Sequence, residues 1–85
     1  MKLSIVSPEK TLYSGDVVSV AVPGTKGRFE VLDNHAPIIS SLQAGQLTYK
    51  GDEEVTLDIA GGFINVADNR VSICVELADK QAGKQ

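Results

Sequence analysis

A chain of 85 residues, 42% of them apolar, is long enough for one compact domain and too short for two. No apolar run approaches the roughly 18 residues of a membrane-spanning helix, so we expect any contact with a membrane to be peripheral. A net charge of −3, with eight scattered Lys and Arg residues, argues against a nucleic-acid surface, and the single cysteine excludes an internal disulfide and favours an intracellular location.

The start of the chain shows the period-two alternation of a β-strand. Leu3 and Ile5 share one face, and the strand ends at Pro8 because proline has no N–H to donate to a neighbouring strand. We expect a short edge strand over residues 10–13. A further strand is predicted over residues 17–22, whose valines favour a packed, pleated surface.

Two turns separate the strands that follow. Residues 23–27 include two glycines, which adopt positive φ without a steric penalty, and this predicts a tight, exposed reversal before a strand over 28–32. Asp33-Asn34 turns the chain again. The residue before Pro37 is extended, so a short strand is expected over residues 38–42.

The second half of the chain has the pattern of two hairpins. One joins residues 45–50 to 55–60, and the other joins 63–67 to 70–77. Gly61-Gly62 between them predicts a bulge or a close approach of the backbone between sheets. Turn signals recur at roughly 8 to 12 residues, which is typical of an antiparallel sandwich or barrel. The expected fold is all-β, a flattened antiparallel β-sandwich or barrel of about eight to ten short strands.

The same alternation predicts a core. The residues expected to be mostly buried are Ile5, Val18, Val20, Val22, Val31, Leu57, Ile59, Val71, Ile73 and Val75. Cys74 falls on the opposite face of its strand, where a second sheet is expected to cover it and leave a buried, unreactive thiol. Tyr49 alternates with Leu47 and is expected to be partly exposed.

Few side chains could carry chemistry. One histidine and one cysteine cannot supply the usual four protein ligands of a zinc site, and no acid–base pair stands out. We therefore expect no metal, no cofactor and no catalytic site. His35 is either a half-buried turn residue whose ring donates to a carbonyl or part of a partner surface.

Three passages stand out in order along the chain. They are Leu3-Ser4-Ile5-Val6-Ser7-Pro8-Glu9 with Leu12-Tyr13-Ser14-Gly15, then Gly27-Arg28-Phe29-Glu30-Val31-Leu32-Asp33-Asn34-His35-Ala36-Pro37-Ile38-Ile39, then Gly45-x-Leu47-Thr48-Tyr49 with Ile59-Ala60-Gly61-Gly62-Phe63. Together they resemble the epsilon subunit of F-type ATP synthases. The resemblance covers residues 1–77, nearly the whole chain.

The resemblance implies a β-sandwich domain over residues 1–77, at the foot of the central stalk, followed by a polar stub over 78–85 that we expect to fray. It implies a non-catalytic rotor component that contacts the gamma subunit and the c ring and couples proton flow to ATP synthesis. The complex would hold it peripherally at the cytoplasmic face of a bacterial membrane. Relatives commonly continue into a helical hairpin that can inhibit ATP hydrolysis or bind ATP, and neither property is expected of this sandwich alone.

The resemblance also implies where partners bind. The expected contact residues are Lys26, Arg28, His35, Ser40, Ser41 and Leu42. Arg28 stands where relatives often have an acid, and Glu30 stands where they often have a glycine. The contact chemistry of this loop is therefore expected to differ from that of relatives.

One alternative function comes from another class of protein. Carrier domains of the lipoyl or biotinyl type are also all-β units that present a lysine on a hairpin, and Lys26 is the candidate attachment site. The acid or methionine beside that lysine is missing, since its neighbours are Thr25 and Gly27.

Overall fold

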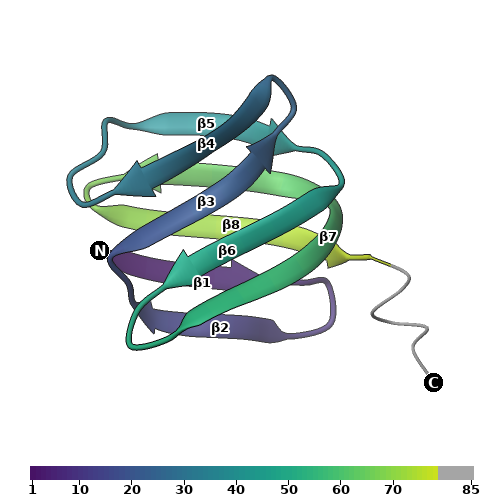
Figure 1. Ribbon diagram of the computed structural model, residues 1–85, viewed down its shortest axis with the longest axis horizontal. Helices are drawn as coiled ribbons and strands as arrows, with labels where there is room; N and C mark the ends of the chain where they lie inside the picture. The colour runs from purple at the N-terminus through teal and green to yellow at the C-terminus, as the bar shows by residue number, and fades with distance from the viewer. Residues whose placement is uncertain (79–85) are drawn as a thin grey trace.

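The computed structural model describes residues 1–78, which form eight strands joined by short turns (Figure 1). The strands are β1 (Lys2–Val6), β2 (Thr11–Asp16), β3 (Ser19–Gly24), β4 (Gly27–Leu32), β5 (Ile38–Leu42), β6 (Gly45–Lys50), β7 (Glu54–Ala67) and β8 (Arg70–Leu77). No helix that could cross a membrane occurs in this range. The predicted fraying of residues 78–85 falls outside the described residues except at Ala78, whose N–H donates to the Asp58 carbonyl at 3.1 Å.

The strands form one sheet that folds over on itself to make two layers. Their order is β2-β1-β8-β7-β5-β3-β4, and β6 pairs with both β3 and β7. In Figure 1, β3, β4 and β6 lie in front of β5, β8 and β1. The expected all-β sandwich is confirmed.

One strand pair departs from the expected antiparallel arrangement. β1 and β8 run parallel, with Leu3 opposite Val71 and Ile5 opposite Ile73, whereas the other pairs are antiparallel. A parallel pair needs a long connection, and here almost the whole described chain lies between the two strands.

β7 is the longest strand and belongs to both layers. Its first part pairs with β6, and its second part pairs with β5 and β8. The prediction of two separate strands over 55–60 and 63–67 is wrong, because the chain does not turn at Gly61-Gly62. The predicted bulge is confirmed by a register shift between Ile59 and Gly61, and such a bulge bends the strand from one layer into the other.

Among residues 1–78, fifteen hydrophobic residues are buried between the layers. They are Leu3, Ile5, Val17, Val20, Val22, Val31, Leu42, Leu47, Tyr49, Ile59, Ile64, Val66, Val71, Ile73 and Val75. The prediction for Val18 is wrong, since it is 57% exposed, while Val17 is buried. Both valines precede β3, so the alternation of that strand does not extend to them. Leu57 is only partly buried, against the edge of the core.

Two predictions about exposure are also wrong. Cys74 is exposed, because it lies on the outer face of β8, which is open in the described part of the chain. Tyr49 is buried at 8% exposure, because it shares the inner face of β6 with Leu47. Its ring lies 4.4 Å, centroid to centroid, from the ring of Tyr13. Burial raises the pKa of Tyr49, and the neighbouring Tyr13 makes a smaller contribution in the same direction.

Candidate functional site

The hairpin between β3 and β4 ends in a tight loop that depends on two glycines. Gly24 pairs with Gly27, which leaves Thr25 and Lys26 at the tip. Gly27 has a φ of 131°, in the region that favours glycine. A Cβ at Gly24 would lie 2.7 Å from the Gly27 carbonyl oxygen and 2.9 Å from the ring of Phe29. The loop therefore presents Lys26 to solvent on a closely packed turn.

Hydrogen bonds hold this hairpin against β5. The Thr25 N–H donates to the Ser41 carbonyl at 3.1 Å, and the hydroxyls of the same two residues lie 2.9 Å apart. The Gln43 N–H donates to the Pro23 carbonyl at 2.8 Å. These contacts join segments that are far apart in the sequence into one surface.

A concavity of about 540 Å³ lies between the hairpin and β5. The side chains that line it, called here the hairpin surface, are those of Thr25, Lys26, Arg28, Phe29, Ile38, Ile39, Ser40 and Ser41. Four of the six contact residues expected from the sequence, Lys26, Arg28, Ser40 and Ser41, are thus brought together.

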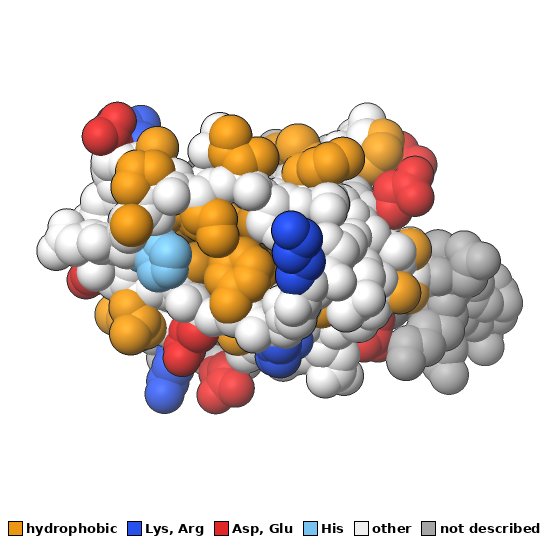
Figure 2. Space-filling model, turned by 90° about the horizontal axis from the view of Figure 1, so that it is seen from above, with side chains coloured by type: hydrophobic (Ala, Val, Ile, Leu, Met, Phe, Trp, Pro, Cys, Tyr) orange, Lys and Arg blue, Asp and Glu red, His pale blue; other side chains and the backbone are white. Residues whose placement is uncertain are grey.

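The other two expected contact residues lie elsewhere. Leu42 is 4% exposed, so its side chain packs in the core and supports β5 from inside. His35 is half-buried in the connection between β4 and β5, where its N–H donates to the Leu32 carbonyl at 3.1 Å. Its ring Nδ1 lies 2.7 Å from the Ala36 carbonyl oxygen. Figure 2 shows the histidine at the margin of a patch of hydrophobic side chains.

The turn that precedes His35 is held by distant residues. Asn34 has a φ of 63°, and its N–H donates to Oδ1 of Asn69 at 2.8 Å. The Asp33 carboxylate lies 2.8 Å from the N-terminal ammonium of Met1. Both contacts join the β4–β5 connection to the opposite layer, and no local pattern in the sequence indicates them.

Two basic residues border the hairpin surface, and one of them, Arg28, also borders a further concavity together with Glu30 and Glu54. Lys26 and Arg28 are exposed, and none of the described residues of the hairpin surface is an Asp or a Glu. Arg28 donates through Nη1 to the backbone carbonyl of Gln46 on β6. This bond orients the guanidinium and leaves its remaining N–H groups for a partner.

Apolar side chains that were not predicted from the sequence as contact residues complete the hairpin surface. Ile39 is 77% exposed, while Phe29 and Ile38 are partly buried against the core. The alternation of this strand could have indicated them, because Ile39 and Ser41 occupy outward-facing positions of the strand that buries Leu42. Exposed apolar side chains that lie together, as Ile39 does with Ile38 and Phe29, are a mark of an interaction surface.

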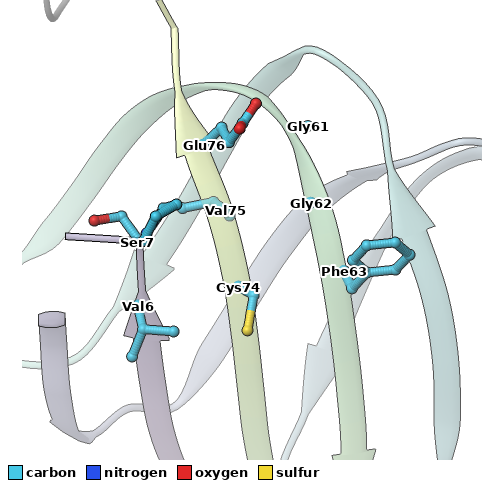
Figure 3. A pocket seen from close by; sticks show the side chains of 9 residues that line it. Val6, Ser7, Gly61, Gly62, Phe63, Cys74, Val75 and Glu76 are labelled. Atoms are coloured by element: carbon cyan, nitrogen blue, oxygen red, sulfur yellow. The ribbon is translucent and has the colours of Figure 1, made fainter. Parts of the chain in front are cut away.

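A second concavity, of about 560 Å³, lies on the outer face of the other layer (Figure 3). Val6 is paired with Cys74, and Cys74 is paired with Phe63, so the three side chains form a row across β1, β8 and β7. Phe63 is 64% exposed. This groove is mostly apolar and contains none of the contact residues expected from the sequence.

Comparison with known proteins identifies relatives over most of the chain. Residues 1–81 match the family described as ATP synthase, Delta/Epsilon chain, beta-sandwich domain. The ATP synthase epsilon chain of Leptospira interrogans is 44% identical over 77 residues, which cover 89% of this chain and 61% of that protein. The epsilon chain of Desulfosudis oleivorans is 41% identical over 83 residues, covering 95% and 62% respectively. This chain therefore spans about three fifths of the length of these relatives.

Solved structures share the same fold. A chain in the central stalk and c-ring structure of the Tetrahymena thermophila mitochondrial ATP synthase superposes with a TM-score of 0.82 at 19% identity, covering 99% of this chain and 69% of that chain. A chain from the Euglena gracilis mitochondrial enzyme gives 0.80 at 20% identity, covering 96% and 58%. At these identities the likeness concerns the fold alone. The sequence relatives favour the resemblance to epsilon chains over the carrier alternative with Lys26.

Proposed function

The chain belongs to the delta/epsilon family of ATP synthase subunits as their β-sandwich domain, and from this we propose that it joins the gamma subunit to the c ring in the rotor. It carries no catalytic site of its own and transmits rotation, so that proton flow through the ring is coupled to ATP synthesis. The complex holds it peripherally at the cytoplasmic face of a bacterial membrane.

The observation that carries this proposal is the hairpin surface. It combines two exposed cations with exposed apolar and hydroxyl side chains, a composition suited to a protein partner. Hydrogen bonds from Thr25 and Gln43 fix the hairpin to β5, so the surface is formed before a partner arrives. A joint that transmits torque needs such a rigid body, and a close-packed interior resists deformation.

The proposed contacts follow from exposure. Lys26, Arg28, Ser40 and Ser41 touch the partner directly. His35, half-buried in the connection that leads into β5, forms the border of the contact. Leu42 is left out because its side chain is buried. Arg28 meets an acidic or carbonyl-rich loop, since a guanidinium binds acceptors with planar spacing.

The test is co-assembly of the full chain with gamma and the c ring. Arg28→Glu should weaken assembly by roughly 1 to 3 kcal/mol, because it places a carboxylate opposite acceptors. Lys10→Glu is the matched control, since it makes the same change in charge at an exposed residue beside β2, at the other end of the strand order. Circular dichroism of each variant checks that the fold is kept.

This experiment distinguishes the proposed contacts of the hairpin surface from the proposed rotor role. Unchanged affinity and coupling for both Arg28→Glu and His35→Ala would reject the assignment of the hairpin surface. Failure of the unmodified chain to join gamma and the c ring under any condition would instead reject the rotor role.

A further inference from the structure

We propose that a concavity beside the β6–β7 turn binds an alkylammonium group, such as a lysine side chain of a protein partner or a free polyamine carries. The volume of this concavity is about 320 Å³. It lies near the end of β3 where Ser19 pairs with Lys50, whereas the hairpin surface lies at the end where Gly24 pairs with Gly27. The site is therefore separate from the surface proposed to contact gamma and the c ring.

Two segments that are far apart in the sequence form the walls of this concavity. Tyr13 and Asp16 come from β2, and the β6–β7 turn supplies Asp52 and Glu53. The segments approach closely at Gly51, where a Cβ would lie 3.0 Å from the Asp16 carbonyl oxygen. The Gly51 N–H donates to the Glu53 carbonyl at 3.0 Å, which closes the turn. The fold itself thus builds the walls of the site.

The hydroxyl of Tyr49 is a polar group that the fold leaves without a partner in this concavity. Tyr49 is 8% exposed and belongs to the lining. Its hydroxyl makes no hydrogen bond to any of residues 1–78, and no fully buried side-chain nitrogen or oxygen in that range lacks a partner. The hydroxyl oxygen therefore reaches the surface, at the floor of the concavity. Polar groups on such buried side chains normally have a partner, and here a ligand can supply it.

Negative charge surrounds this hydroxyl. Asp16, Asp52 and Glu53 are exposed, and no Lys or Arg is among the described residues that line the concavity. The Asp16 carboxylate lies 3.4 Å from Nζ of Lys2, a pair that is weak because its side chains are 75% and 70% exposed. Lys50 lines a different concavity, on the outer face of the sheet. Asp52 and Glu53 form no ion pair within the described residues, so a cation meets two free carboxylates.

The remaining side chains favour an organic cation over a metal ion. No group of three or more His, Cys, Asp or Glu residues within residues 1–78 is placed to hold a metal ion. The concavity instead offers carbon surface from Tyr13 and Val55, which are partly buried against the core. An aromatic ring attracts a cation within about 6 Å of its centroid, and a methylene stem packs on the same carbon surface.

An alkylammonium group matches these acceptors. Its three N–H donors rotate on a flexible stem, whereas a guanidinium presents a rigid planar fork. The acceptors here are the Tyr49 hydroxyl oxygen and the carboxylates of Asp52 and Glu53, which belong to separate side chains and so suit the rotating group. The volume lies at the lower end of the roughly 300 to 1,000 Å³ of small-ligand sites, which is enough for one ammonium and its stem.

NMR titration of the full chain tests the site, with N-acetyl-lysine N-methylamide and spermidine as probes. Both should shift the amide signals of Gly51, Asp52 and Glu53 saturably, with dissociation constants in the millimolar range that rise with added salt. N-acetyl-norleucine N-methylamide keeps the carbon chain of the lysine probe and lacks its charge. It should cause no such shifts.

Three variants test the residues of the site. Glu53→Gln should raise the dissociation constants of both probes about two- to fivefold, the effect of one exposed ion pair. Tyr49→Phe keeps the ring in the core and removes the hydroxyl, so it should raise them about fivefold, the effect of one hydrogen bond. Glu9→Gln is the matched control, since it removes the same charge at an exposed residue of the β1–β2 turn, at the other end of β2 from Asp16. It should leave both constants unchanged.

The two probes distinguish the sources of the ammonium group. Binding of spermidine that is about tenfold tighter than that of the lysine probe indicates a polyamine, because further ammonium groups then add to the affinity. Similar affinities indicate a lysine side chain. The proposal is overturned by the absence of saturable shifts with both probes, by equal shifts with the norleucine compound, or by an equal loss with Glu9→Gln. Neither gamma nor the c ring takes part in this titration, so its failure leaves the proposed function untouched.

Discussion

Ile73 illustrates how single side chains hold the two layers together. It is 1% exposed on the inner face of β8, opposite Ile5 on one side and Ile64 on the other. Ile73→Ala should lower the free energy of unfolding by about 2 to 5 kcal/mol, because it removes buried methyl groups and leaves a cavity. Urea denaturation measures this loss. Val18→Ala, at a 57% exposed site, is the control and should change stability by less than about 0.5 kcal/mol.

Tyr49 should make the free energy of unfolding depend on pH in the alkaline range. Burial, and then Tyr13, raise its pKa in the folded state above the unfolded value of 10.0. The unfolded chain then loses this proton at lower pH than the folded chain does. The stability contributed by Tyr49 is therefore present below pH 10 and is lost as pH rises toward the folded pKa. Tyr49→Phe keeps the ring, so its unfolding free energy should fall less over this alkaline range. Identical pH profiles for the two proteins would contradict the assignment.

Exposure at the residue scale was predictable wherever a strand alternates without interruption. Val71, Ile73 and Val75 are buried as expected, because β8 runs straight through them. Val17 and Val18 could not be assigned from alternation, because they lie in a connection. The exposure of Cys74 could not be predicted from its strand alone. It depends on which face of β8 stays uncovered, and the packing of the two layers decides that.

At the scale of elements, the close approach of β7 to β8 depends on Gly62. This residue has a φ of 157°, and a Cβ there would lie 2.1 Å from the carbonyl oxygen of Cys74. Gly62→Ala must therefore displace the backbone of β8. Gly27 is the matched control, since its φ is 131° but a Cβ there meets nothing within 4 Å.

The two alanine variants separate steric conflict from backbone preference. Gly27→Ala should cost about 1 to 2 kcal/mol, the penalty of a left-handed conformation alone. Gly62→Ala should cost clearly more, because the clash is added to it. Thermal unfolding followed by circular dichroism gives both values. A smaller loss for Gly62→Ala than for Gly27→Ala would mean that β7 and β8 do not approach closely at this point.

Local signals predicted turns and hairpins well and predicted longer-range pairing poorly. The β3–β4 and β6–β7 hairpins lie where glycines and polar residues indicated them. The glycines at Gly61-Gly62 correctly indicated a bulge, but the strands predicted on either side of them are one continuous strand, because a bulge does not end the pairing. The meeting of β5 with the hairpin depends on contacts across the sheet, so the hairpin surface was predicted only in part.

At the scale of the whole molecule, the continuous sheet and single core predict cooperative unfolding. The buried residues of both layers form one cluster, so no part of it can separate without exposing the rest. Far-UV circular dichroism, which follows the strands, and tyrosine fluorescence, which follows Tyr13 and Tyr49, should give one transition with the same midpoint in urea. Two separated midpoints would show that the layers unfold independently.

The parallel pairing of β1 with β8 has a consequence for how the protein is made. β1 leaves the ribosome first and β8 leaves it last among the eight strands, yet the two are neighbours in the sheet. The edge of β1 that pairs with β8 therefore stays unpaired until translation of the domain is nearly complete. Pairing of such distant segments is slow relative to local hairpin formation, and exposed edges promote aggregation. The domain is therefore most open to edge-to-edge association at the stage when seven strands have emerged and the eighth has not.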